Sequence, residues 1–92
     1  CPGTITFDIE GGSPDRRLAL MAGAGGGTDS IPGGGCAGTV LDLGEMSRLD
    51  VVSADAQGGA TVVRNFPDAH CGKALQVVDL FTCRTSNVIA LP

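Results

Sequence analysis

The sequence contains no tryptophan and no tyrosine, and only three of its 92 residues are phenylalanine. Aromatic side chains bury the largest area per residue, so the core must be built mainly from Val, Leu, Ile and Ala. Domains that bind sugars commonly stack the sugar ring on Trp or Tyr. We therefore expect neither a lectin nor a chitin-binding role.

Long apolar runs and an excess of positive charge are also missing. No stretch approaches the ~20 apolar residues that a membrane-spanning helix requires. Ten acidic residues outnumber six basic ones, which gives a net charge of −4. Because phosphate backbones and anionic membrane surfaces are bound by basic surfaces, the composition predicts no nucleic-acid partner and no membrane partner.

Four widely spaced cysteines are present: Cys1, Cys36, Cys71 and Cys83. None forms a C-x-x-C pair, which disfavours a zinc site or a redox motif. A small chain with 15 glycines gains little stability from its core alone, so cross-links are expected. The start at Cys1 rather than Met is typical of a processed chain. We therefore predict a secreted, extracellular protein with two disulfides. Lipidation of Cys1 is less favoured because it would leave three cysteines.

The pairing of the cysteines has three alternatives. We favour Cys71–Cys83, which would clamp a strand-turn unit, together with Cys1–Cys36. The nested arrangement of Cys36–Cys71 with Cys1–Cys83 stays open.

Alternating apolar and polar residues predict β-strands. In residues 4–10, Ile5, Phe7 and Ile9 alternate with polar side chains, as in a strand with one buried face. Further strands are expected at residues 16–21, 37–43, 48–53, 60–66, 74–80 and 87–91, with a turn at 44–47 and a hairpin joining 48–53 to 60–66. This spacing predicts a single domain, 1–92, folded as a small all-β sandwich or compact barrel of six to seven short strands. The expected core is Ile5, Phe7, Ile9, Val40, Val51, Val62, Phe66, Leu75, Val77 and Ile89.

Residues 60–83 contain a strand, an Asp-x-x-Cys-Gly turn, a second strand and a final cysteine. This unit resembles one found in small secreted fungal cysteine-rich proteins. It is also similar to half of a βγ-crystallin-like Greek key. The residues that carry the match are Phe66, Cys71, Gly72 and Cys83. The resemblance implies a β fold and an effector-like or toxin-like secreted protein. It implies no ligand, because the calcium-binding signature of crystallin keys is absent.

The chemistry-bearing residues form no strong catalytic pattern. His70 is the only histidine, and Asp68 lies two positions before it. These two side chains are too few for a metal site once the cysteines are bridged, so no metal and no cofactor are expected. We expect no catalytic residues. A small secreted hydrolase or ribonuclease centred on His70, with Glu10 or Glu45 and Arg64, stays an alternative.

Two segments are long for connections in so small a domain. Residues 22–35 include seven glycines and are expected to form a loop, and residues 54–59 form the loop of the predicted hairpin. Connections of this length are commonly functional or disordered. We predict that together they bind a protein partner through Asp29, Ile31, Asp55 and Gln57. The other alternative is a self-assembling structural surface protein, so a homo-oligomer stays open.

Overall fold

A computed structural model describes residues 1–91 and shows two antiparallel β-sheets. Its elements are β1 (Gly3–Ile9), β2 (Arg17–Ser30), β3 (Val40–Ser53), β4 (Ala60–Phe66), the 3₁₀ helix η1 (Asp68–His70), β5 (Ala74–Asp79) and β6 (Ile89–Ala90). One sheet pairs β1 with β4, and the other has the order β3-β2-β5-β6. The predicted small all-β sandwich is confirmed. Within residues 1–91 no helix is long and apolar enough to cross a membrane.

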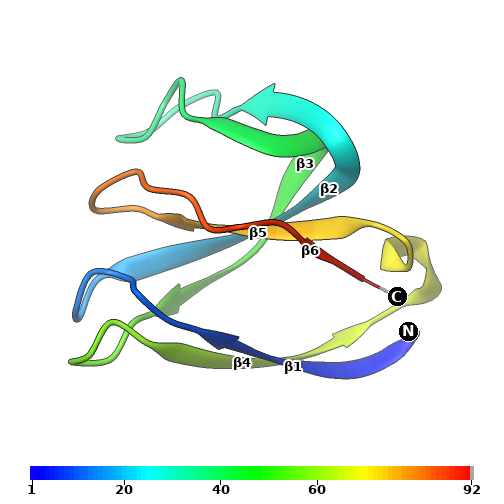
Figure 1. The fold of residues 1–92 in the computed structure, drawn as a ribbon, viewed down its shortest axis with the longest axis horizontal. Coiled ribbons are helices and arrows are strands. Elements are labelled where there is room, and N and C mark those ends of the chain that lie inside the picture. The colour runs from blue at the N-terminus through cyan, green and yellow to red at the C-terminus, as the bar shows by residue number, and fades with distance from the viewer. Residues whose placement is uncertain (92) are drawn as a thin grey trace.

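The first half of strand β2 lies at the centre of the fold and is buried on both faces. Figure 1 shows the β1–β4 sheet at the bottom, β5 and the first half of β2 in the middle, and the curled ends of β2 and β3 at the top. Successive residues of a strand point to opposite faces. Accordingly, Leu20 and Ala22 pack towards β1 and β4, whereas Ala19 and Met21 pack towards the curled ends. This two-sided burial explains the unbroken apolar run at the start of β2.

Two core clusters flank the central sheet. The cluster between the two sheets contains Leu20, Ala22, Val62, Phe66, Leu75 and Leu91. The cluster beneath the curled ends contains Ala19, Met21, Leu41, Leu43, Ala74 and Val78. Phe66 is fully buried and meets Phe7 edge to face, with ring centroids 5.7 Å apart. Two of the three phenylalanines therefore pack together between the sheets.

The predicted core is correct in its larger part. Val62, Phe66 and Leu75 are buried, and Ile5, Phe7, Ile9, Val51 and Val77 are partly buried against the clusters. The prediction is wrong for Val40 and Ile89, which have 62% and 45% of their surface exposed. Val40 points away because its neighbour Leu41 occupies the inward position of β3. Ile89 lies on β6, a two-residue strand at the edge of its sheet.

The glycine-rich segment predicted as a loop is largely part of a strand. Residues 22–30 continue β2, and the turn predicted at 44–47 lies inside β3. The pairing of these two strands shifts register three times, and Glu45 has a positive φ of 47° at one irregularity. Such bulges bend a strand and increase its twist. The glycines therefore make a curved β-ribbon, and only residues 31–39 connect its two strands.

The predicted hairpin between residues 48–53 and 60–66 is also wrong. β3 and β4 belong to different sheets, and β4 instead pairs with β1 over seven residues, from Gly3 opposite Phe66 to Ile9 opposite Ala60. The connection 54–59 therefore crosses from one sheet to the other. Both arrangements bury the same alternate side chains, so the local pattern does not distinguish them.

The disulfides join Cys1 to Cys71 and Cys36 to Cys83. All four cysteines are bonded, as predicted, but the pairing differs from both arrangements that we considered. Pairing of β1 with β4 brings the start of the chain beside η1, where Cys71 follows. The curled ribbon brings residues 35–36 over the turn after β5, and the carbonyl of Gly35 lies 3.7 Å from the Cys83 sulfur. Long-range strand pairing therefore decides the connectivity.

Replacing Gly23 with Ala should destabilise the fold. An added Cβ would lie 2.6 Å from the Gly44 carbonyl oxygen, so the two backbones would have to separate. We expect the free energy of unfolding to fall by about 1–3 kcal/mol, as measured by urea denaturation. Gly25→Ala is the matched control, because its Cβ would make an ordinary 3.5 Å contact with Ala74. Equal losses for the two variants would contradict the close approach.

Candidate binding site

A groove of about 860 Å³ lies between the central sheet and the connection 31–39. One side is formed by Ala19 and Met21 of β2 and by Met46, Ser47 and Arg48 of β3. The opposite side is formed by Asp29 to Cys36, and Leu80, which follows β5, also lines the groove. The groove exists because the curled ribbon stands away from the central sheet on this side. Its volume lies within the range of sites for small ligands or single peptide segments.

The connection above the groove is held at both ends. Its N-terminal end is fixed by Ile31, whose N–H donates to Thr39 and whose carbonyl accepts from Gly38, at 3.0 and 2.8 Å. Further along, Cys36 is bonded to Cys83 in the turn after β5. A wall that is fixed in this way loses little entropy when a ligand binds.

Two glycines in this wall are not required by the fold. Gly33 and Gly35 have no positive φ, and an added Cβ at either would meet no atom within 4 Å. Glycine is needed where backbones approach closely or φ is positive, and neither condition holds here. Their effect is to leave peptide N–H and C=O groups without a side chain beside them. A ligand could therefore hydrogen-bond directly to the backbone of this wall.

The lining of the groove is mixed and more apolar than polar. Both methionines of the chain, Met21 and Met46, are among the lining residues, together with Ala19 and Ile31. Methionine adapts its shape to irregular apolar partners. Asp29 and Arg48 supply one charge of each sign. This arrangement suits a ligand that has an apolar body and a few polar groups, and it offers no paired groups for acid–base chemistry.

The four predicted contact residues do not form one site. Asp29 and Ile31 line the groove, whereas Asp55 and Gln57 line a separate hollow of about 540 Å³. Figure 1 shows the connection 31–39 at the top of the molecule and the connection 54–59 at the bottom. The curl of β2 and β3 separates them.

Two of these side chains also have local roles. Asp29 accepts the N–H of Ser30 at 2.8 Å, and Asp55 accepts the N–H groups of Gln57 and Gly59, both at 2.9 Å. These bonds shape the chain around each carboxylate. The sequence did not single out Met21, Met46 or Arg48, because strand alternation does not tell a groove position from a core position. The one available signal was that the chain contains only two methionines.

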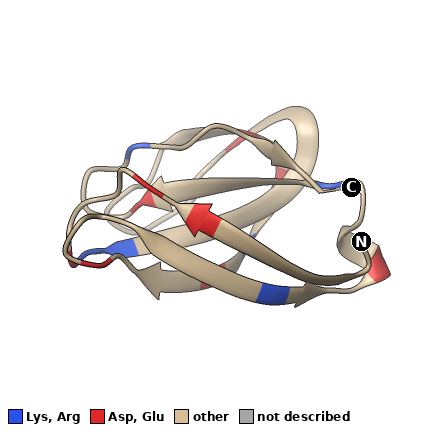
Figure 2. Ribbon diagram, turned by 60° about the horizontal axis from the view of Figure 1, so that its bottom comes forward, with Lys and Arg blue, Asp and Glu red and all other residues tan. Residues whose placement is uncertain are grey.

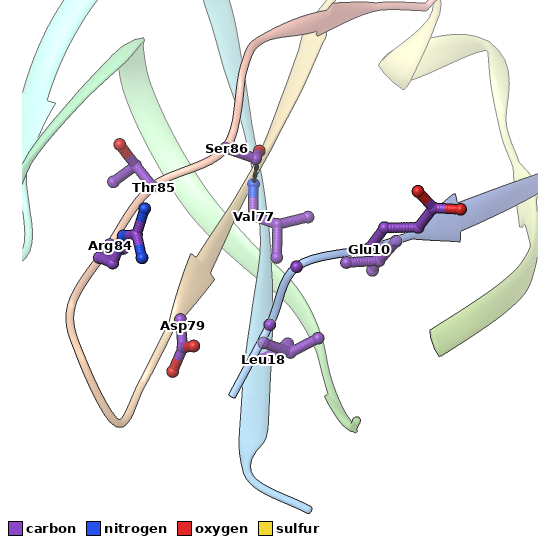
Figure 3. Close-up of a pocket in the computed structure, with 10 residues that line it drawn as sticks. Glu10, Leu18, Val77, Asp79, Arg84, Thr85 and Ser86 are labelled. Atoms are coloured by element: carbon purple, nitrogen blue, oxygen red, sulfur yellow. Dashed lines mark hydrogen bonds between the residues drawn. The ribbon is translucent and has the colours of Figure 1, made fainter. Parts of the chain in front are cut away.

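A third cavity, of about 120 Å³, is lined in part by Asp79 at the end of β5. Figure 3 shows Arg84, Thr85 and Ser86 along the segment that returns after β5, near Val77 and Asp79. One carboxylate oxygen of Asp79 accepts the N–H and the hydroxyl of Ser13, at 2.8 and 2.7 Å. The other accepts the N–H groups of Phe81 and Thr82, at 2.9 and 3.3 Å.

These contacts make Asp79 a structural carboxylate. Burial alone would raise the pKa of Asp79, but the Ser13 hydroxyl and the three backbone N–H groups outweigh burial and lower the pKa from 3.8 to about 2. The group is therefore ionised at neutral pH, and four donors occupy its two oxygens. It ties the turn after β5 to the segment that precedes β2. It is poorly suited to act as a general acid or base.

Replacing Asp79 with Asn should cost stability in a pH-dependent way. The lowered pKa stabilises the folded chain fully above the ordinary carboxyl range, and this stabilisation is lost as pH falls from about 5 to about 2. We expect the variant to lose roughly 2 kcal/mol of unfolding free energy at neutral pH and much less near pH 2. Urea denaturation at both pH values measures the difference. The exposed carboxylate of Asp42, changed to Asn, is the control. A loss that is independent of pH would contradict this role.

His70 ends the 3₁₀ helix η1 and lies beside Phe66. The imidazole lies edge to face against Phe66 with centroids 6.0 Å apart, and its buried Nδ1 has no hydrogen-bond partner within residues 1–91. The Arg64 guanidinium lies 3.6 Å from Asp50 of β3, and Glu10 lines the Asp79 hollow. Among residues 1–91 no hydrogen bond or ion pair joins His70 to Glu10, Glu45 or Arg64.

The fold is that of a small, disulfide-bonded β-sandwich with a groove beside its curled ribbon. No protein-family model, no curated protein and no solved structure matches this chain.

Proposed function

We propose that the chain is a secreted, non-enzymatic binding domain whose groove holds an apolar segment of a partner protein. The observation that carries the proposal is the groove itself. It combines apolar lining residues, a wall fixed by the Cys36–Cys83 disulfide, and backbone groups at Gly33 and Gly35 without a side chain beside them. Peptide-binding sites use side-chain pockets together with main-chain hydrogen bonds in the same way.

The surroundings of the groove favour a protein partner over a small molecule. Leu80 lines the groove, and the next residue, Phe81, has 59% of its surface exposed, with the Arg16 guanidinium 4.1 Å from its ring centroid. An exposed aromatic ring beside an arginine is typical of residues that anchor protein interfaces. A partner seated in the groove could continue over this ring.

An extracellular location is compatible with two disulfides, which persist in oxidising compartments. The resemblance of residues 60–83 to small secreted fungal proteins adds a proposed context, an effector-like or toxin-like protein that acts on a host or competitor protein. In this unit Phe66 is a core residue, and Cys71 and Cys83 belong to different disulfides.

The test uses a peptide as the probe. A library of displayed linear peptides is selected on the oxidised chain, and the recovered peptide is titrated against the protein by fluorescence anisotropy. Met46→Ala removes an apolar side chain from the groove, and we expect it to weaken binding by about tenfold. Gln57→Ala is the matched control, because it alters the separate hollow, and its affinity should equal that of the unaltered chain. Recovery of no peptide, or equal weakening by both variants, would reject the groove as the site.

The variant His70→Ala distinguishes the proposed binding domain from the enzyme alternative. The binding domain keeps its peptide affinity in this variant, because His70 does not line the groove. A hydrolase or ribonuclease would release product from an ester or RNA substrate, and it would lose that activity in the variant. Turnover by the unaltered chain that disappears with His70 would overturn the proposal of a non-enzymatic protein.

A further inference from the structure

The outer edge of β1 is an unprotected strand edge. β1 pairs with β4 over seven residues without a register shift, and within residues 1–91 no strand pairs with its other side. Protein edges are commonly protected by proline, lysine, a bulge or a covering segment. Residues 3–9 contain neither proline nor lysine, and Asp8 is the only charged residue among them. The backbone groups of this edge are therefore available to another strand.

An apolar slot lies beside the same edge. It is lined by Phe7 and Ile9 of β1, Leu20, Leu75 and Val77 of the central sheet, and Ile89 of β6, with Asp8, Gln76 and Ser86 at its margin. The slot is small, about 20 Å³, and its lining shows that β1 lies beside β5 and β6 here. A strand added to β1 would lie over the slot and cover side chains that are now partly exposed, Phe7, Ile9 and Ile89 among them.

The opposite margin of the sandwich is closed in a different way. There Arg64 of β4 lies 3.6 Å from Asp50 of β3, so a charged pair spans the two sheets. The inward residues of β4, Val62 and Phe66, are already buried. The β4 edge thus offers backbone groups without an apolar slot. The two margins therefore differ, and the margin at β1 is the more favourable one for the addition of a strand.

From this we infer that a second copy of the chain pairs with β1 along this edge. Antiparallel pairing of β1 with itself about Thr6 places Thr4 opposite Asp8 on the outer face and Ile5 opposite Phe7 on the inner face. No like charges meet, and the aliphatic–aromatic pairs are favourable neighbours across strands. Ile9 would lie opposite Gly3, where an added Cβ would meet no atom within 4 Å, so the space is free.

The resulting dimer has a two-fold axis at Thr6 and a continuous four-stranded sheet, β4-β1-β1-β4. In Figure 2 the β1–β4 sheet comes forward and carries few charged residues, which suits close approach of a second copy. The contact area is small, so we expect a dissociation constant of roughly 100 µM. This dimer leaves the groove open and does not depend on the proposed peptide binding.

The experiment exploits the symmetry of the pairing. Thr6 is exposed, and in the paired register it faces its own copy, so Thr6→Lys places two like charges opposite each other. We expect it to weaken dimerisation by about three- to tenfold in sedimentation equilibrium from about 10 µM to about 1 mM. Thr6→Glu should weaken it similarly, whereas an equal mixture of the two variants should restore association. This restoration distinguishes repulsion from misfolding.

Val63→Lys is the matched control. Val63 lies opposite Thr6 on β4, has 64% of its surface exposed, and is one strand away from the proposed interface. It should leave the dissociation constant unchanged. A chain that stays monomeric over the whole concentration range overturns the inference. So does a dimer that Val63→Lys weakens and Thr6→Lys does not, because that result would place the contact on β4.

Discussion

The close approach of the β2 and β3 backbones is the contact on which the rest of the structure depends. A Cβ atom at Gly27 would lie 2.7 Å from the Gly44 Cα, and one at Gly23 would lie equally close to the neighbouring backbone. Because the strands pack without side chains between them, the ribbon curls back over the central sheet. The curl buries Leu41 and Leu43, leaves the groove beneath it, and brings Cys36 to Cys83.

The sequence predicted those parts of the fold that local alternation determines. The strand predicted at 4–10 is observed as β1, and the strand predicted at 60–66 matches the bounds of β4. The length of β2 could not be predicted, because glycine has a low strand preference and a glycine run resembles a loop. Here a neighbouring backbone leaves no room for a side chain at Gly23 and Gly27, and a single sequence does not show that neighbour. The pairing of β4 with β1 was not predicted, because two strands that lie more than 50 residues apart in the sequence leave no local pattern of their pairing.

The residues that line the candidate groove were predicted in part for the same reason. Asp29 and Ile31 line the groove. They could be predicted because the length of the connection beside them is visible in the sequence. Met21 and Met46 were missed, because their position depends on how the ribbon curls. Asp55 and Gln57 were grouped with the wrong partners, since the crossing of residues 54–59 between the sheets was not foreseen. Local composition identified the exposed segments but not which of them lie together.

The order of the disulfides along the chain has a consequence for proteolysis. The bonds Cys1–Cys71 and Cys36–Cys83 interlace, because Cys36 lies between Cys1 and Cys71 in the sequence and Cys83 lies after Cys71. A single cut of the backbone anywhere between Cys1 and Cys83 therefore leaves both fragments covalently joined. With Cys1–Cys36 and Cys71–Cys83, one cut between residues 36 and 71 would release two separate pieces. A protein exposed to extracellular proteases would stay in one piece after a first cleavage, and the sheets could hold their positions around the cut.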